Sequence, residues 1–463
     1  MQGCGPSRAT KSSMPRKLVL IVIDGLTPGV FERAVEERSA PALAYLADHG
    51  SYGRAVSTFP SLTPVCLTSI AVGAGPDVHR IPHLVWYDRE ERRLVEYGSS
   101  FAALRAAGMT RSILDTILWM NQRHLSPGAV TVYEALEDAG LVAAAINITC
   151  YRGRTRYLPK LPGVTKAAYG PKRFFYYSLF ESDRTGAPLA VRNRAGGSVD
   201  AYAAATGRWL VTRDGFDFLA YYLSDYDYAS HVHGPEATHA ALARVDAAVS
   251  ALMAAAGGPD EFLERYAVIL CSDHGQTAVT QAAQLGEPLA RVRHEIVVAA
   301  SNRAGQVYLL PNARHEPAEL AALLDGSQAV EVVLRREEGD AVARREGSEL
   351  RFRPDGDGWE TSGDRALLDH PNALERAWAA LANPYAGELV VSAAPGFEFA
   401  DIAGRHHAGG GSHGSLDAGD SLVPMLGVGV ETLPVRITEI APAVLEHFEI
   451  ELPPYARRLA HAA

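Results

Sequence analysis

The segment Leu18-Val-Leu-Ile-Val-Ile-Asp24-Gly25 decides the fold class of this 463-residue chain. Its apolar residues form an unbroken run, which is typical of a parallel strand buried on both faces. The run is too short to cross a membrane, and it ends in Asp24-Gly25 and not in the small-residue cleavage site of a signal peptide. We therefore predict a buried strand that carries a carboxylate at its carboxyl end.

Three further apolar runs follow along the chain, at residues 141–148, 216–223 and 266–271. A helical pattern at residues 130–139 precedes the first run, and another at residues 235–256 separates the last two. In that second pattern, apolar side chains recur at the spacing of an amphipathic helix. Strands that alternate with helices in this way indicate an α/β sandwich with a mostly parallel central sheet.

Residues 277–401 have a different texture. Short strand patterns lie there at residues 306–310, 329–334 and 350–352. We interpret the charged and glycine-rich pieces between them, at residues 335–340 and 354–358, as solvated loops. We predict that residues 277–401 form a smaller α+β cap inserted into the catalytic core. The core then comprises residues 15–276 and 402–463, with residues 1–14 as a flexible tail.

Composition narrows the class of protein further. The hydrophobic fraction of 47% and the charged fraction of 21% are those of an ordinary globular protein. A net charge of -10 argues against a stable nucleic-acid partner, since such proteins usually carry a basic surface. The four cysteines are widely scattered, which suits a reducing compartment. We therefore expect a cytoplasmic protein without a membrane partner.

Aspartates follow three of the apolar runs, at Asp24, Asp227 and Asp273. The carboxyl ends of parallel strands meet at one edge of a sheet, and ligands bind at that edge. A single aspartate there is explained by helix capping. Three carboxylates that converge repel one another unless cations lie among them. Together they predict a metal site.

Histidines accompany these carboxylates at spacings that suit metal ligands. His231 follows Asp227 by four residues, and His274 is adjacent to Asp273. His413 lies in the glycine-rich stretch 409–415. Oxygen and nitrogen ligands in this number suit two divalent ions, and histidine favours zinc, with manganese or iron as alternatives. Weaker ligand candidates are His233, His406 and His407.

A nucleophile is available at Thr63, where the segment 59–73 passes from a loop into an apolar helical stretch. A hydroxyl near the first turn of that helix lies where free backbone N–H groups favour an anion. Beside a metal ion it becomes an activated nucleophile. The alternative is that Thr63 only caps the helix.

Taken in order, these residues resemble the alkaline phosphatase superfamily, in particular its nucleotide pyrophosphatase/phosphodiesterase branch. The resemblance rests on five motifs in this sequence, namely Asp24-Gly25, Thr63 ahead of Gly73-Ala-Gly-Pro-Asp-Val-His79, Asp227-Tyr-Ala-Ser-His-Val-His-Gly-Pro235, Ser272-Asp-His-Gly275 and His413-Gly414. It implies an alkaline-phosphatase-like three-layer sandwich. It also implies that one metal is held next to Thr63 and that this threonine is transiently esterified.

The resemblance assigns the metal ligands residue by residue. Asp24, Asp273 and His274 hold the metal beside Thr63, and the second metal is held by Asp227, His231 and His413. Two departures bear on the substrate. Arg80 replaces the usual glycine after the histidine matched by His79, and Leu84 stands where phosphodiesterases carry a phosphate-binding asparagine. Thr58-Phe-Pro60 offers a rival nucleophile, although spacing favours Thr63.

The predicted substrate is a small anionic molecule that contains phosphate, with nucleotides among the candidates. Hydrolysis of a phosphodiester or nucleotide pyrophosphate is the leading hypothesis. The alternatives are a phosphomonoester, phosphonate or sulfate ester hydrolase, or a catalytically silent homologue that binds metal or nucleotide. Candidates for the leaving-group side are basic or aromatic, or else ordinary exposed loop residues: Arg152, Arg154, Arg156, Lys172, Arg173, Tyr169, Phe174 and Tyr176.

Overall fold

The computed structural model describes residues 16–161, 163–188 and 198–456. The predicted tail, residues 1–14, lies outside the described residues. The main sheet has eight strands in the order β2-β23-β11-β1-β10-β5-β8-β9. Their bounds are β1 Lys17–Ile23, β2 Ser51–Val56, β5 Ala143–Ile146, β8 Arg173–Tyr176, β9 Phe180–Glu181, β10 Phe218–Leu223, β11 Tyr266–Cys271 and β23 Leu422–Val428.

Five neighbouring strands of this sheet are parallel, in the order β11-β1-β10-β5-β8. Antiparallel pairings lie at the edges, namely β11 with β23 and β23 with β2 on one side, and β8 with β9 on the other. The predicted apolar runs are therefore confirmed as the centre of a mostly parallel sheet. The strand at the start of the chain, β1, lies between β10 and β11.

Both faces of the main sheet are covered, as β1 shows residue by residue. Leu18, Leu20 and Val22 belong to one hydrophobic cluster. Val19 and Ile21 point to the opposite cluster. Full burial of a side chain of this size stabilises the fold by about 1.5–3 kcal/mol. Because every position is buried, the sequence shows an unbroken apolar run and no alternation.

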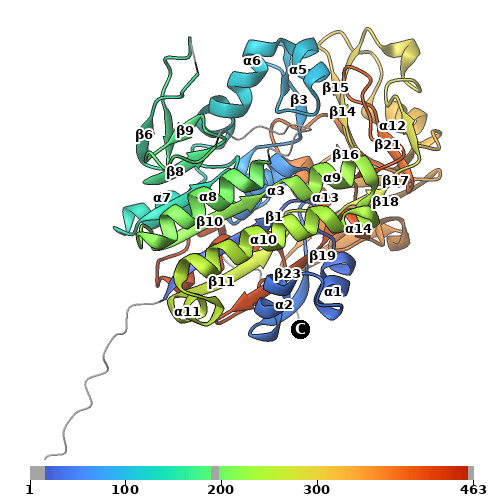
Figure 1. Cartoon of the computed structure of the whole chain (residues 1–463). Helices are drawn as coiled ribbons and strands as arrows, with labels where there is room; N and C mark the ends of the chain where they lie inside the picture. The colour runs from blue at the N-terminus through green and yellow to red at the C-terminus, as the bar shows by residue number, and fades with distance from the viewer. Residues whose placement is uncertain (1–15, 162, 189–197, 457–463) are drawn as a thin grey trace, which may run out of the picture.

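Helices form the two outer layers. Green helices α8 and α10 lie side by side across one face (Figure 1). The helices that contribute to that face are α1 Pro28–Glu36, α2 Pro41–Asp48, α8 Val199–Thr212, α10 His239–Ala256 and α11 Pro259–Arg265. The opposite face is covered by α3 Thr63–Val72, α7 Val132–Asp138 and α15 Ile440–His447.

The helix predicted from residue 235 begins later, at His239. Pro235–Ala237 instead forms a separate 3-10 turn. The Thr238 hydroxyl donates to the carbonyl of Pro235 at 2.7 Å, which closes that turn before the α-helix starts. By length and composition α10 could cross a membrane, but core helices of soluble proteins pass the same test, and Leu242 and Val245 of α10 are buried in the hydrophobic core.

A second, antiparallel sheet has seven strands in the order β14-β15-β20-β16-β17-β18-β19, on the right of Figure 1. Its strands are β14 Ile296–Ser301, β15 Ala304–Leu309, β16 Val330–Glu337, β17 Asp340–Arg345, β18 Ser348–Asp355, β19 Gly358–Gly363 and β20 Leu389–Ala393. Helices α12 Pro317–Asp325 and α13 Ala373–Ala382 pack against it. All these elements fall within residues 277–401, while the boundaries of a separate cap stay a prediction.

The interpretation of residues 335–340 and 354–358 as loops is wrong, although residues 354–358 are solvent-exposed as predicted. The first piece ends β16, turns at Glu338–Gly339 and starts β17. The second ends β18 and turns into β19. Arg335 can be buried because its guanidinium is paired with two carboxylates. Glu337 lies on the same strand, and Glu349 lies on β18. A charged run therefore concealed a strand whose charges are paired internally.

Smaller helices and two-stranded ribbons lie outside the two large sheets. The helical ones are α4 Pro76–His79, α5 Phe101–Ala107, α6 Met109–Leu114, the π-helix Asp115–His124, α9 Asp225–His233 and α14 Ala418–Ser421. Two-stranded ribbons pair β3 Val85–Asp88 with β4 Arg93–Glu96, β6 Thr155–Tyr157 with β7 Ala168–Gly170, β12 Thr277–Ala278 with β22 Gly411–Ser412, and β13 Gln281–Ala283 with β21 Phe397–Phe399.

Candidate active site

Three adjacent strands of the main sheet lead directly into the residues that carry the predicted chemistry. Asp24 follows β1, and Asp273 and His274 follow β11. The strand β10 leads into α9, whose first turn carries Asp227. Because β1 pairs in parallel with both β10 and β11, these residues meet at the same edge of the sheet. His413 joins them from the loop after β22.

Asp24, Asp273 and His274 form the first group that could hold a metal ion, with ligand atoms within 4.8 Å of one another. His274 Nε2 lies 3.3 Å from Asp24 Oδ1 and 3.5 Å from Asp273 Oδ2. The Thr63 hydroxyl lies 3.0 Å from the same nitrogen. The hydroxyl of Thr63 is therefore in direct contact with a candidate metal ligand.

The second group consists of Asp227, His274 and His413. His413 Nε2 lies 3.8 Å from Asp227 Oδ1, and the rings of His274 and His413 stack at 3.6 Å. His231 Nε2 lies 3.3 Å from the other oxygen of Asp227, so the i, i+4 pair shares a face of α9 as predicted. The structure thus brings together all six predicted ligands, with His274 shared between the two groups.

The three histidines have the same hydrogen-bonding arrangement. In each ring Nδ1 faces a backbone carbonyl, that of Gly411 for His231, Gly275 for His274 and Ser61 for His413, at 2.8 to 3.0 Å. A carbonyl only accepts, so Nδ1 carries the proton and Nε2 of the neutral ring keeps its lone pair. Carbonyl contacts of this kind fix the tautomer of metal-binding histidines. The donor set therefore fits metal ions.

The carboxylates of Asp24 and Asp273 share a single positive partner, His274. Asp24 Oδ1 and Asp273 Oδ2 are buried without a hydrogen-bond partner among the described residues. Burial and the charge of Asp227 raise the pKa of Asp24, while burial and Asp24 raise the pKa of Asp273 well above its usual value. Burial alone would lower the pKa of His274, but Asp273 and Asp24 outweigh it and raise this pKa to about 10. Divalent cations would relieve this repulsion.

The other group differs because two histidines face one carboxylate. Burial opposes ionisation of Asp227, but His231 outweighs it and holds the pKa of Asp227 well below its usual value. Burial and the neighbouring charge of His274 hold the pKa of His413 well below its usual value. His413 is therefore neutral, which is the form that binds metals.

Thr63 is the first residue of α3, and the N-cap position belongs to Leu62. Its hydroxyl contacts His274 and not the backbone of the helix, so helix capping does not explain it. The rival Thr58 is buried, and its carbonyl accepts from Arg376 at 3.1 Å. Geometry therefore supports the choice of Thr63 that the motif spacing made.

Three residues support the cluster, and two of them, Tyr222 and Gln276, belong to none of the motifs found in the sequence. The Tyr222 hydroxyl donates to Asp24 Oδ2, and the Gln276 amide donates to Asp227 Oδ1. Gly25 has a left-handed φ of 70°, and a Cβ there would lie 2.9 Å from Asp227 Oδ1. Burial of the strand-end tyrosine and the glutamine after the Asp-His pair are the only signals that could have pointed to them.

The histidines judged weaker have different surroundings. His233 is exposed at the end of α9. His407 lies in a loop, as predicted, but its ring stacks on that of His231 with centroids 4.0 Å apart. Its Nδ1 lies 3.1 Å from the buried carboxylate of Glu398. His406 stays a loop residue without a role in the cluster.

Most of the leaving-group candidates have structural roles. Phe174 and Tyr176 are buried in the core and are not available to a substrate. Arg152 and Arg154 both pair with Glu134. The remaining four are partly or fully exposed, with Arg173 paired to Asp183: Arg156, Tyr169, Lys172 and Arg173.

The two departures from the family pattern have local explanations. Arg80 ends α4 with a left-handed φ of 69°, the conformation that glycine adopts most readily. Leu84 packs against the hydrophobic core.

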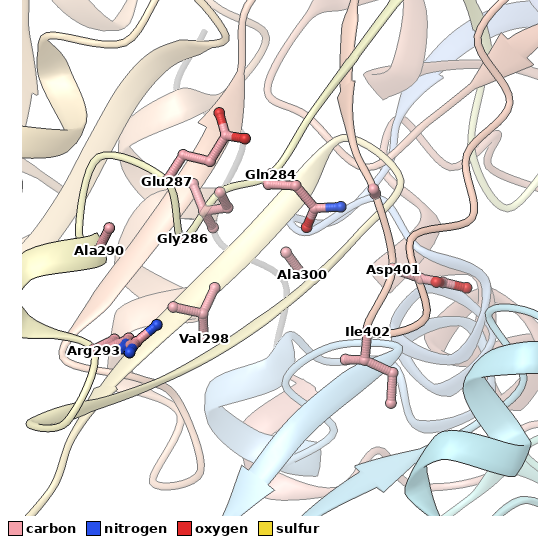
Figure 2. Close-up of a pocket in the computed structure, with 11 residues that line it drawn as sticks. Gln284, Gly286, Glu287, Ala290, Arg293, Val298, Ala300, Asp401 and Ile402 are labelled. Carbon is pink, nitrogen blue, oxygen red and sulfur yellow. The ribbon is translucent and has the colours of Figure 1, made fainter.

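A pocket of about 360 Å³ also lies away from the cluster, and Figure 2 shows Gln284, Arg293 and Asp401 in its wall. None of the predicted site residues lines that pocket.

The family model of type I phosphodiesterases / nucleotide pyrophosphatases matches residues 18–416. The chain therefore belongs to this family, within the alkaline phosphatase superfamily, and is a hydrolase of the phosphoesterase type. The predicted family is thus confirmed.

Solved structures share the fold over nearly the whole chain. Phosphonoacetate hydrolase from Sinorhizobium meliloti 1021 in complex with phosphonoformate gives a TM-score of 0.63 at 17% identity, covering 94% of this chain and 96% of that one. Murine ectonucleotide pyrophosphatase / phosphodiesterase 5 gives 0.61 at 12% identity, covering 95% and 97%. An inactive variant of the murine protein, with a threonine replaced by alanine, binds AMP and covers 95% and 96% at the same score and identity. The predicted fold class is confirmed.

Proposed function

We propose that this chain is a two-metal phosphoesterase that hydrolyses a phosphodiester or nucleotide pyrophosphate bond through a phosphothreonine at Thr63. One observation carries the proposal. The Thr63 hydroxyl lies 3.0 Å from His274 Nε2. The same nitrogen lies 3.3 Å from Asp24 and 3.5 Å from Asp273, whose carboxylates each keep a buried oxygen without a hydrogen-bond partner among the described residues. Asp24, Asp273 and His274 would hold the cation next to Thr63, and Asp227, His231 and His413 would hold the other.

The chemistry of the chain's own residues follows from this arrangement. Thr63 Oγ1 loses its proton and attacks the phosphorus, while the bond from phosphorus to the leaving oxygen breaks on the opposite side. Water then attacks the phosphorus of this threonine ester, the bond from phosphorus to Thr63 Oγ1 breaks, and a phosphomonoester leaves while Thr63 regains its proton. Two divalent ions, when bound, stabilise the attacking and leaving oxygens of such an in-line displacement. Histidine and carboxylate ligands favour zinc, with manganese or iron as alternatives.

The relatives support this assignment. The murine phosphodiesterase binds AMP in a form that is inactive because a threonine is missing. A small anionic substrate with a phosphoryl group, such as a nucleotide, suits the site proposed for this chain. The buried free thiols of Cys66, Cys150 and Cys271 suit a reducing compartment, which supports the proposed cytoplasmic location.

A second candidate is hydrolysis of a phosphonate. Leu84 lacks the polar side chain that phosphodiesterases use at this position, and the fold is shared with phosphonoacetate hydrolase. A phosphomonoester or sulfate ester hydrolase is the wider form of this alternative.

Turnover of bis-p-nitrophenyl phosphate, p-nitrophenyl phosphate and phosphonoacetate by the zinc-loaded protein separates these candidates. We expect the diester to have the highest kcat/KM. A strong preference for the monoester or for phosphonoacetate would replace the leading candidate by the second. Absence of turnover with all three, at full metal content, would favour the catalytically silent homologue.

A further inference from the structure

The turn between β14 and β15 brings an amide of the second sheet into the metal-binding cluster. Asn302 is 5% exposed, and its Nδ2 lies 3.1 Å from His413 Nε2. The next residue holds the turn in place, because the backbone N–H of Arg303 donates to the carbonyl of His413 at 2.8 Å. The Arg303 guanidinium is in turn paired with the buried Asp420 at 2.8 Å. The turn and the His413 loop are therefore rigidly joined.

The orientation of the Asn302 amide is set at both ends. His413 Nδ1 faces the carbonyl of Ser61 at 2.8 Å and therefore carries the proton, so His413 Nε2 is an acceptor. The group 3.1 Å from it must be the NH₂ of the amide. The amide oxygen accepts from the Ser301 hydroxyl at 2.9 Å. The NH₂ group thus points into the cluster.

A cation bound to His413 uses the lone pair on Nε2 with which Asn302 is now hydrogen-bonded. The amide N–H then needs another acceptor, because a buried donor without a partner is unfavourable. The oxygens of an anion bound at the cations are the acceptors that such a site provides, and a fixed neutral donor beside developing negative charge stabilises a transition state. On the basis of the proposed function, we propose that the Asn302 amide donates to a non-bridging oxygen of the substrate's phosphoryl group, as a further catalytic residue.

A purely structural reason for an asparagine at this position has to be separated from this role. Asn302 has a left-handed φ of 57°, which asparagine, aspartate and glycine tolerate better than other residues. Its carbonyl also accepts from the backbone of Phe399. Asn302→Gly and Asn302→Asp both satisfy the turn but lack the NH₂ donor, so they test the side chain and not the backbone.

The experiment compares these two variants with Asn312→Ala, which removes an exposed amide that donates only to the carbonyl of His294. Zinc content is measured first, and the affinity of the zinc-loaded proteins for inorganic phosphate is then measured by calorimetry. We expect full zinc content in all variants. Phosphate affinity falls about tenfold or more in Asn302→Gly, since a hydrogen bond to a charged group is lost. It falls further in Asn302→Asp, and kcat/KM for the diester falls about 10²-fold in both.

Two results would overturn the inference. One is an Asn302→Gly protein that binds phosphate and turns over the diester like the wild type at full zinc content. The other is loss of zinc without any change in phosphate affinity of the fraction that keeps zinc, because Asn302 would then only support His413. A wild-type protein that holds zinc but neither binds phosphate nor turns over the diester would contradict the proposed function itself, and this result is separate from the variant series.

Discussion

In the second sheet the buried guanidinium of Arg335 lies 2.7 Å from Glu337 and 3.0 Å from Glu349, whereas Asp24 and Asp273 at the edge of the main sheet each keep a buried oxygen without a hydrogen-bond partner. Buried charge that is paired within the chain costs little further and needs nothing from outside. Buried carboxylates without cations remain unfavourable until a ligand arrives, which is a common property of functional sites. The candidate active site differs from the second sheet because its unpartnered oxygens belong to neighbouring carboxylates that raise one another's pKa.

Replacing the proposed nucleophile, Thr63, has the largest expected effect, because it removes the atom that we propose attacks the substrate. In Thr63→Ala we expect turnover of bis-p-nitrophenyl phosphate to fall at least about 10³-fold, with zinc content unchanged. Steady-state kinetics on the zinc-loaded protein measures this. The matched control is Thr58→Ala, which we expect to keep turnover within a few-fold of wild type if it folds. Activity retained in Thr63→Ala and lost in a folded, zinc-loaded Thr58→Ala would transfer the role to Thr58.

Removal of metal should lower the stability of the fold, because the proposed cation sites lie at the edge of the main sheet. Cations bound at about 1,000 times their Kd stabilise the folded state by about 4 kcal/mol, so chelation should lower Tm clearly and abolish turnover. Thermal scans before and after dialysis against EDTA measure the shift, and zinc should restore both properties. The account predicts the same shift in an Arg335→Leu protein, since that pair holds no metal. An unchanged Tm on chelation would contradict the proposal that the cluster at the main sheet, unlike the paired charges of the second sheet, depends on bound cations.

The metal-free protein should also lose stability as pH rises. The pKa of His274 is about 10 in the folded chain and about 6.5 in an unfolded chain. Between these values the folded state binds the extra proton, so the stabilisation is complete below about pH 6.5 and is lost toward pH 10. The slope is at most about 1.4 kcal/mol per pH unit for one proton. Urea unfolding at pH 7 and pH 9 measures it, and the zinc-loaded protein, whose His274 is neutral, should lack this slope.

The smallest expected effects belong to the second sheet. Arg335→Leu should cost about 1–2 kcal/mol of unfolding free energy, because Glu337 and Glu349 each lose one partner. Both are about a third exposed, at 32% and 30%, and keep Arg351 and Arg344 as partners. Turnover should not change. The exposed pair of Arg353 and Glu360 is the control, and Arg353→Leu should cost at most about 0.5 kcal/mol. A large loss of turnover in Arg335→Leu would show that the two sheets are coupled.

Much of the fold and of the cluster was predictable because it depends on local patterns. Strands buried on both faces, such as β1 and β11, appear as apolar runs, and parallel strands bring Asp24 and Asp273 to one edge whatever the details of packing. Asp227 and His231 are four residues apart, so they share a face as soon as this segment forms a helix. The motif spacing favoured Thr63 over Thr58. The contact between Thr63 and His274 became visible only in the structure.

The rest depends on partners that are distant in the sequence. Nothing near Arg335 indicates that Glu349 will lie beside it, so a charged run looked like a loop. Tyr222 and Asn302 contact the cluster only because a strand end and a turn of the second sheet are packed against it. The Thr238 hydroxyl closes the turn before α10, so this helix starts four residues after Pro235, the proline that had suggested its start.

The most direct test is a crystal structure of the zinc-soaked chain with anomalous difference maps recorded at the zinc edge. The account predicts two peaks per chain, one in contact with Asp24, Asp273 and His274, and the other in contact with Asp227, His231 and His413. A well-ordered structure with no peak among these side chains, or with zinc bound only elsewhere, would contradict it.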